Sequence, residues 1–124
     1  MIRTLVSVVE LGGYADFGPL YRRLGFEPET VNSGRRALST VKQLEPAAVV
    51  AEFNYQSDFR DRTSALESLL ALTQGMADAR VVVIYEPRDE PQLERLRQRF
   101  PSFTAIPRPV READLERVLR NGMA

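Results

Sequence analysis

One acidic residue draws attention because of the segment that precedes it. Glu52 follows the apolar residues 47–51 in the stretch PAAVVAEFNYQSDF. This run is typical of a strand that is buried on both faces, where an unpaired charge is costly. Glu52 therefore has two interpretations: a group that takes part in chemistry at the end of a strand, or a strand-end carboxylate that is half in water.

The chemistry open to the chain is limited, because it contains neither Cys nor His. Disulfides, thiolate nucleophiles, imidazole acid–base catalysis and the usual zinc sites are excluded. A Ser or Thr nucleophile would need a carboxylate or Lys42, the only lysine, as its base, and Lys42 falls on a predicted helix away from the strand ends. We expect a protein that is not an enzyme, with no catalytic residue, no metal and no cofactor.

Length and charge exclude further classes of function. The 124 residues fit one domain, residues 1–124, with one continuous core. The 17 basic and 17 acidic residues cancel, so no long-range field steers the chain to nucleic acid or to an anionic membrane. No stretch approaches the roughly 20 apolar residues of a membrane span, and the N-terminal MIRTLVSVVELGG is interpreted as a strand rather than a signal peptide. The absence of Cys fits a cytoplasmic location.

Five strands alternate with five helices in the hydrophobicity pattern. Short apolar segments between turn residues predict strands, and apolar residues spaced by three and four predict helices. The strands fall within residues 4–9, 27–33, 47–51, 79–87 and 103–110, and the helices within residues 14–26, 34–45, 63–75, 90–100 and 111–122. Such alternation predicts a doubly wound α/β fold with a parallel sheet, whose binding crevice lies at the carboxyl ends of the strands.

Two stretches resemble response-regulator receiver domains of the CheY-like superfamily. In LGFEPETVNSGRRALSTVKQLEPAAVVAEF, residues 24–53, a Leu-Gly-Phe closes the first helix, a Gly opens a helix with Ala-Leu, and a Pro precedes the third strand, as in that family. RPVREADLERVL, residues 108–119, is similar to the family's Lys-Pro and final helix. The resemblance spans the chain, with an insertion after the third strand, and implies a flavodoxin-like (βα)5 fold with strand order 2-1-3-4-5.

The receiver mechanism, carried over by position, meets residues of other types. That mechanism uses an acidic pair for Mg²⁺, an Asp that accepts the phosphoryl group, a Thr or Ser, and a Lys. The resemblance assigns the acidic pair to Val8 and Val9, and the acid that often follows the pair to Glu10. It assigns the phosphoacceptor to Glu52, the switch hydroxyl to Tyr85, and the Lys-Pro to Arg108 and Pro109. Two valines offer Mg²⁺ no oxygen, and a Glu extends one methylene further than Asp, which spoils in-line transfer. The chain thus resembles a pseudo-receiver, which works without phosphorylation.

The resemblance also suggests a partner for Glu52. Glu52 and Arg108 fall at the ends of neighbouring strands on one rim, where a guanidinium can grip a carboxylate bidentately. Glu52 would then imitate a phosphoaspartate; the alternative, a structural carboxylate, is preferred. Tyr85 is too bulky for a switch hydroxyl and is expected to cover the empty pocket, and the family's Lys-Pro implies a cis bond before Pro109. The two glycines of ELGGY lack the third glycine of a dinucleotide-binding turn and predict no nucleotide site.

Three functions stay open, in order of preference. The first is a non-enzymatic module of bacterial two-component signalling or phosphorelay that binds a protein, a kinase or an output protein. Its face of helix 90–100, last strand and helix 111–122, rich in Arg and Glu, is a candidate for homodimer contact. The second is a sensor that binds a small apolar molecule at a rim formed by Val8, Val9, Phe53 and Tyr85. The third is a true phosphoacceptor with a non-standard acid.

Overall fold

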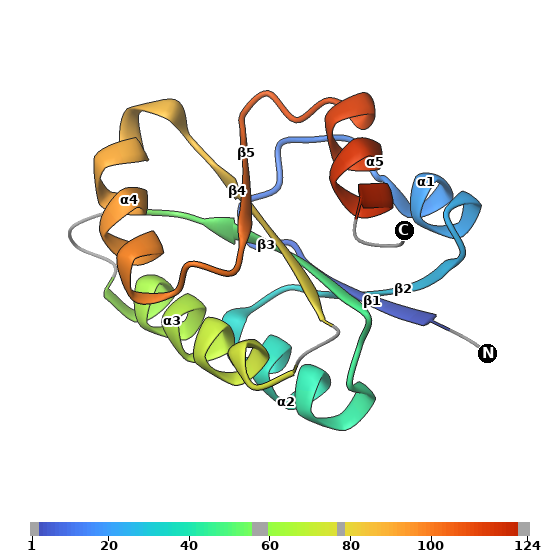
Figure 1. Ribbon diagram of the computed structural model, residues 1–124, viewed down its shortest axis with the longest axis horizontal. Coiled ribbons are helices and arrows are strands. Elements are labelled where there is room, and N and C mark those ends of the chain that lie inside the picture. Colours follow the sequence, from blue (N-terminus) through green and yellow to red (C-terminus); the bar gives the residue numbers. More distant parts are fainter. Residues whose placement is uncertain (1–2, 56–59, 77–78, 122–124) are drawn as a thin grey trace.

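Five parallel strands form a twisted sheet at the centre of the molecule (Figure 1). The computed structural model describes residues 3–55, 60–76 and 79–121. The strands are β1 (Arg3–Val8), β2 (Phe26–Val31), β3 (Ala48–Phe53), β4 (Arg80–Tyr85) and β5 (Thr104–Pro107). Their order in the sheet is β2-β1-β3-β4-β5, which confirms the predicted flavodoxin-like order.

Helices cover both faces of the sheet (Figure 1). The helices α1 (Gly18–Arg23) and α5 (Glu112–Asn121) lie on one face, which we call the α1/α5 face. The other face carries α2 (Gly34–Leu44), α3 (Arg60–Gln74) and α4 (Glu90–Arg99), and the short 3-10 helix η1 (Pro87–Asp89) leads into α4. Within the described ranges, no helix is long and apolar enough to cross a membrane.

Each face has its own hydrophobic core, because successive side chains of a strand point to opposite sides. In β3, Val49 and Phe53 pack with the core of the α2, α3 and α4 side, whereas Val50 packs with the core of the α1/α5 face. All six residues of β3 are buried, including Glu52. By the same alternation, the side chain of Glu52 points to the α1/α5 face.

The first helix is shorter than the apolar pattern around it. It begins at Gly18 and has Pro19 in its first turn, where the missing N–H of proline costs nothing. It ends before Gly25, whose φ of +94° is left-handed and suits a residue without a side chain. Residues 9–17 consequently form a long connection at the carboxyl edge of the sheet, next to Glu52.

Candidate functional site

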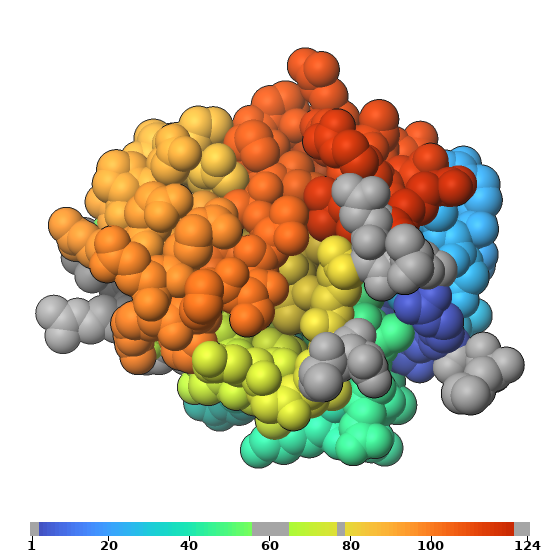
Figure 2. All heavy atoms as spheres, viewed as in Figure 1, coloured from blue at the N-terminus to red at the C-terminus, as the bar shows by residue number. Residues whose placement is uncertain are grey.

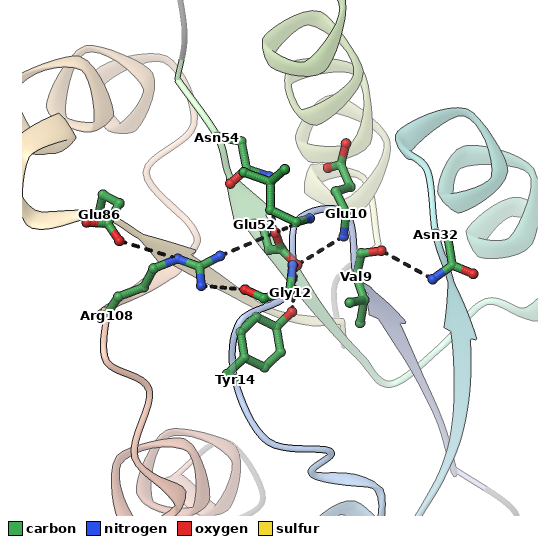
Figure 3. A network of polar contacts seen from close by, with 10 residues as sticks. Val9, Glu10, Gly12, Tyr14, Asn32, Glu52, Asn54, Glu86 and Arg108 are labelled. Carbon is green, nitrogen blue, oxygen red and sulfur yellow. Dashed lines mark hydrogen bonds and ion pairs between the residues drawn. The ribbon is translucent and has the colours of Figure 1, made fainter.

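Glu52 is the centre of a polar network at the carboxyl edge of the sheet (Figure 3). It lies inside β3 rather than after it, opposite Ile84 of β4, and is only 2% exposed. The interpretation of Glu52 as a carboxylate half in water is therefore wrong. A carboxylate that has lost its hydration must find hydrogen-bond donors in the protein, since otherwise the charged form is strongly disfavoured.

The connection after β1 supplies three of these donors from its backbone. The N–H groups of Glu10 and Gly12 donate to Oε2 of Glu52 at 3.0 and 3.3 Å, and the N–H of Leu11 donates to Oε1 at 3.0 Å. Gly12 and Gly13 have φ values of +68° and +84°. Glycines adopt these left-handed angles without steric cost, so the chain can curl around the carboxylate and form a backbone anion site.

Two uncharged side chains complete the hydrogen bonding from either side. The hydroxyl of Tyr14 donates to Oε2 of Glu52 at 2.7 Å, and Nδ2 of Asn54 donates to Oε1 at 3.1 Å. Burial, followed by the hydrogen bond to the Glu52 carboxylate, raises the pKa of the Tyr14 hydroxyl well above its ordinary value. Tyr14 therefore keeps its proton and remains a donor throughout the physiological pH range.

Arg108 provides the cationic partner of Glu52, as predicted, but with a different geometry. It follows β5, and because β4 separates β3 from β5, the two residues are not on neighbouring strands. Its Nη2 lies 3.4 Å from Oε1 of Glu52, while its Nη1 donates to the carbonyl oxygen of Gly12 at 2.5 Å. The predicted bidentate grip is absent from this pair, because the backbone amides and Tyr14 already occupy the other acceptor positions of the carboxylate.

The guanidinium of Arg108 thus joins the connection after β1 to the end of β5. It also stacks over the ring of Tyr14, with 5.4 Å between the guanidinium carbon and the ring centroid, and its Nε lies 3.9 Å from Oε1 of Glu86. The bond between Arg108 and Pro109 is cis, the form that the resemblance to receiver domains implied. The loop 9–14 is therefore held by two side chains, Arg108 and Glu52.

The residues assigned to the acidic pair lie on different sides of the sheet. Val8 is 1% exposed and packs in the core beneath α2 and α3. Val9 is only partly buried and borders a cavity beside β2, where its carbonyl oxygen accepts a hydrogen bond from Asn32. Glu10 enters the network through its backbone N–H.

Two further expectations, that Tyr85 covers the pocket and that four residues form an apolar rim, are wrong because successive side chains of a strand point to opposite faces of the sheet. Tyr85 packs against the core of the α2, α3 and α4 side, so it does not cover the pocket that holds Glu52. Phe53 and Val8 belong to that same core, whereas Val9 borders a cavity of the other face. The four residues expected to form an apolar binding rim therefore do not line one cavity, since the alternation along the strands sends them to both sides.

The donors around Glu52 do not fit the Mg²⁺ and phosphoryl chemistry of receiver domains. Mg²⁺ requires several oxygen ligands in a nearly octahedral arrangement, and Val8 and Val9 supply none. The oxygens of Glu52 already face six donors, three from the backbone and three from side chains. In the described part of the chain, no group of three or more acidic, His or Cys residues is placed to hold a metal ion.

Four members of the network escaped prediction from the sequence: Leu11, Gly12, Tyr14 and Asn54. Leu11, Gly12 and Tyr14 belong to ELGGY, a segment that does not match a dinucleotide-binding turn. Two consecutive glycines after a buried strand do carry a signal, because they permit a backbone anion site as well. Nothing in the sequence indicates that the anion is a side chain of the chain itself.

Solved structures with this fold include response-regulator receiver domains. Chemotaxis protein CheY4 of Vibrio cholerae matches 98% of this chain over 98% of its own, with a TM-score of 0.74 and 12% identity. A CheY-like receiver domain from Methylobacillus flagellatus matches 98% over 99% of its own, with a TM-score of 0.68 and 22% identity. A sensor protein from Polaromonas sp. JS666 matches 98% over 95% of its own, with a TM-score of 0.72 and 20% identity.

The similarity to these proteins is one of structure. No protein-family model and no curated protein sequence matches the chain. At such low identities the comparisons establish the fold, and they confirm the predicted CheY-like receiver architecture.

Proposed function

We propose that the chain, residues 1–124 as one domain, is a non-enzymatic signalling module with a receiver fold that does not depend on phosphorylation. The observation that carries this proposal is the buried carboxylate of Glu52, which is saturated by donors of its own chain at the position that the resemblance assigns to the phosphoacceptor. A receiver that is switched by phosphorylation needs an exposed acceptor and a metal ion beside it. Neither requirement is compatible with the environment of Glu52.

The access of a phosphoryl donor to Glu52 is blocked by the loop 9–14. An attack by Glu52 would first have to release its oxygens from Glu10, Leu11 and Gly12, and then from Tyr14. Each released N–H or O–H would be left without an acceptor in a dry site, which is costly. Glu52 therefore acts as a permanent structural anchor that holds the loop and Arg108 in one arrangement, and this supports the structural role over imitation of a phosphoaspartate.

Because the carboxyl edge of the sheet is held in one arrangement, such a module would act through a protein-binding surface that does not change. The face formed by α4, β5 and α5 is the surface that we propose for protein contact, and Figure 2 shows these segments side by side in orange to red. Its charges are of both signs, with Glu94 beside Arg97 on α4 and Glu116 beside Arg120 on α5. A face with balanced charges is self-complementary across a two-fold axis, so a second copy of the chain is the partner we propose first.

The decisive experiment incubates the protein with acetyl phosphate and Mg²⁺ and reads its intact mass. We expect no added phosphoryl group on the wild type. Glu52→Asp is the matched control, because it restores the usual acceptor side chain without restoring metal ligands at Val8 and Val9, and it should also stay unmodified. A stable phosphoryl group on Glu52 or on a nearby Asp would instead establish a true phosphoacceptor.

The proposed surface is tested separately by analytical ultracentrifugation over a range of protein concentrations. We expect dimers that dissociate after Arg120→Glu on α5, whereas Arg35→Glu on α2, on the opposite face of the sheet, should leave them intact. A monomer at every concentration would remove the homodimer and leave a kinase or an output protein as the partner.

A further inference from the structure

A cavity of about 350 Å³ lies next to the Glu52 network, on the α1/α5 face of the sheet. It is bordered by the ends of β1 and the edge strand β2, by the connection 9–17 and by α1. The space exists because α1 begins only at Gly18, while the connection before it is drawn toward Glu52. Its volume lies within the range of small-molecule sites in proteins.

The mouth of this cavity carries one positive and one negative side chain. Oδ1 of Asp16 lies 3.1 Å, and Nη1 of Arg22 lies 3.5 Å, from the point that a methyl group on Gly18 would occupy. Asp16 accepts the N–H of Gly18 at 2.9 Å, but within the described residues the side chain of Arg22 has neither an ion pair nor a hydrogen bond. The two charged side chains therefore lie close to the same point beside Gly18, and no ion pair joins them.

The inner walls combine hydrogen-bonding groups with apolar surface. Thr30 and Asn32 of the β2 side contribute polar side chains, and the rings of Tyr21 and Phe17 and the ring of Pro28 contribute apolar surface. The wall is thus suited to a short organic group with one polar end, and it is neither a purely apolar pocket nor a highly charged one.

We propose that this cavity binds a free α-amino acid. The ligand's carboxylate would bind Arg22, whose planar guanidinium matches carboxylates, and its ammonium group would bind Asp16, which keeps free lone pairs besides the one used by Gly18. The α-carbon of the ligand would then lie at van der Waals distance from Gly18, and its side chain would extend toward Phe17, Pro28 and Thr30. A simple carboxylic acid or a simple amine would satisfy only one of the two charges and leave the other beside an apolar group.

Tyr14 would connect a ligand in this cavity to the hydrogen-bond network of Glu52. Tyr14 lines the cavity and donates its hydroxyl proton to Glu52. An occupied cavity therefore restrains the same loop that the carboxylate holds. This inference goes beyond the proposed protein-binding role and does not depend on it, because the residues that line the cavity belong to none of α4, β5 and α5.

The test measures amide chemical shifts of the ¹⁵N-labelled protein during titration with each standard L-amino acid at millimolar concentration. We expect at least one amino acid to bind with saturable shifts at residues 14–22 and 30–32. The methyl ester and the N-acetyl derivative of that amino acid, which each lack one charge, should bind at least about tenfold more weakly, as expected for the loss of a charged hydrogen bond.

Three variants separate this site from unspecific binding. Arg22→Ala and Gly18→Ala should each weaken binding at least about tenfold, the first by removing the guanidinium and the second by filling the point between the charges. Gly18 has no left-handed φ, so alanine is compatible with its backbone. Arg35→Ala on α2 is the matched control and should leave affinity unchanged. Absence of saturable shifts with every amino acid, or binding that survives both cavity variants, would overturn the proposal.

Discussion

The molecule contains two ion pairs of similar length in very different surroundings. Nη2 of Arg108 lies 3.4 Å from Oε1 of Glu52, and Nη2 of Arg117 lies 3.2 Å from Oδ1 of Asp114 on the surface of α5. The side chains of the first pair are 16% and 0% exposed, and those of the second are 66% and 38% exposed. By distance alone the surface pair would be the stronger one.

Burial reverses this order. On the surface, water replaces a lost partner, so exposed pairs contribute between about 0 and 1 kcal/mol to stability. The side chain of Glu52 is fully buried, and removal of its carboxylate leaves the amides of the loop 9–14, Tyr14, Asn54 and Arg108 without this acceptor. The cost of breaking a buried network comes from the partners that remain, rather than from the length of the broken contact.

The largest expected effect is that of removing the buried acceptor. Glu52→Ala should lower the free energy of unfolding by about 3–5 kcal/mol, because it leaves the Arg108 cation and several backbone donors unpaired. Urea denaturation followed by circular dichroism measures this change. Glu52→Gln, which keeps the shape and one acceptor oxygen, should cost less than Glu52→Ala. A cost for Glu52→Ala below about 1 kcal/mol would contradict the role of anchor.

The cationic side of the same pair should come second. Arg108→Ala should cost about 2–3 kcal/mol, because it removes hydrogen bonds to the Glu52 carboxylate and to the carbonyl of Gly12. Arg108→Lys should recover part of this loss, since a lysine keeps the charge but cannot reproduce the planar fork that reaches both acceptors. A stability of Arg108→Lys in urea equal to that of the wild type would show that the fork has no importance.

The hydroxyl of Tyr14 should come third. Tyr14→Phe should cost about 1.5–2 kcal/mol at neutral pH, because it removes one hydrogen bond to a charged and buried acceptor while the ring stays in place. Tyr55→Phe, at a tyrosine that is 36% exposed, is the matched control and should change stability little. Urea denaturation of both variants side by side gives the comparison.

The same tyrosine should give stability a dependence on alkaline pH. The pKa of Tyr14 is raised in the folded state, mainly by burial, so above pH of about 10 the unfolded chain loses this proton while the folded protein retains it. Stability should therefore fall as the pH rises above that value, and the difference between wild type and Tyr14→Phe should narrow. A difference that stays constant up to the highest pH at which the protein is folded would speak against the buried hydrogen bond.

The surface pair should show the smallest effect. Arg117→Ala should change the free energy of unfolding by no more than about 0.5 kcal/mol, because both partners are rehydrated when they separate. A larger change, measured in urea under the same conditions as Arg108→Ala, would mean that burial is not what distinguishes the two pairs.

The fold was predictable because its signals are local and repeated. Apolar strand segments and amphipathic helices alternate along the chain, and this pattern leaves a doubly wound parallel sheet as the expected architecture. The pairing of Glu52 with Arg108 was also predictable from their positions at one edge of the sheet. The positions of Tyr85 and Val8 were not, because their facing depends on which residue of each strand starts the alternation, and a shift of one residue sends a side chain to the other core.

The sequence by itself determined which residue types follow or end the strands, with Val8 and Val9 at the first, Glu52 at the third and Arg108 after the fifth, since these are facts of residue type. Only the tertiary structure decided that Glu52 is buried, that the loop 9–14 folds back onto it, and that a cavity opens beside β2. The first two features depend on residues more than 35 positions apart meeting in space, as Glu52 and Tyr14 do. The contact of a loop with a distant strand leaves no periodic trace in the sequence, because each partner satisfies its hydrogen bonds only in the folded state.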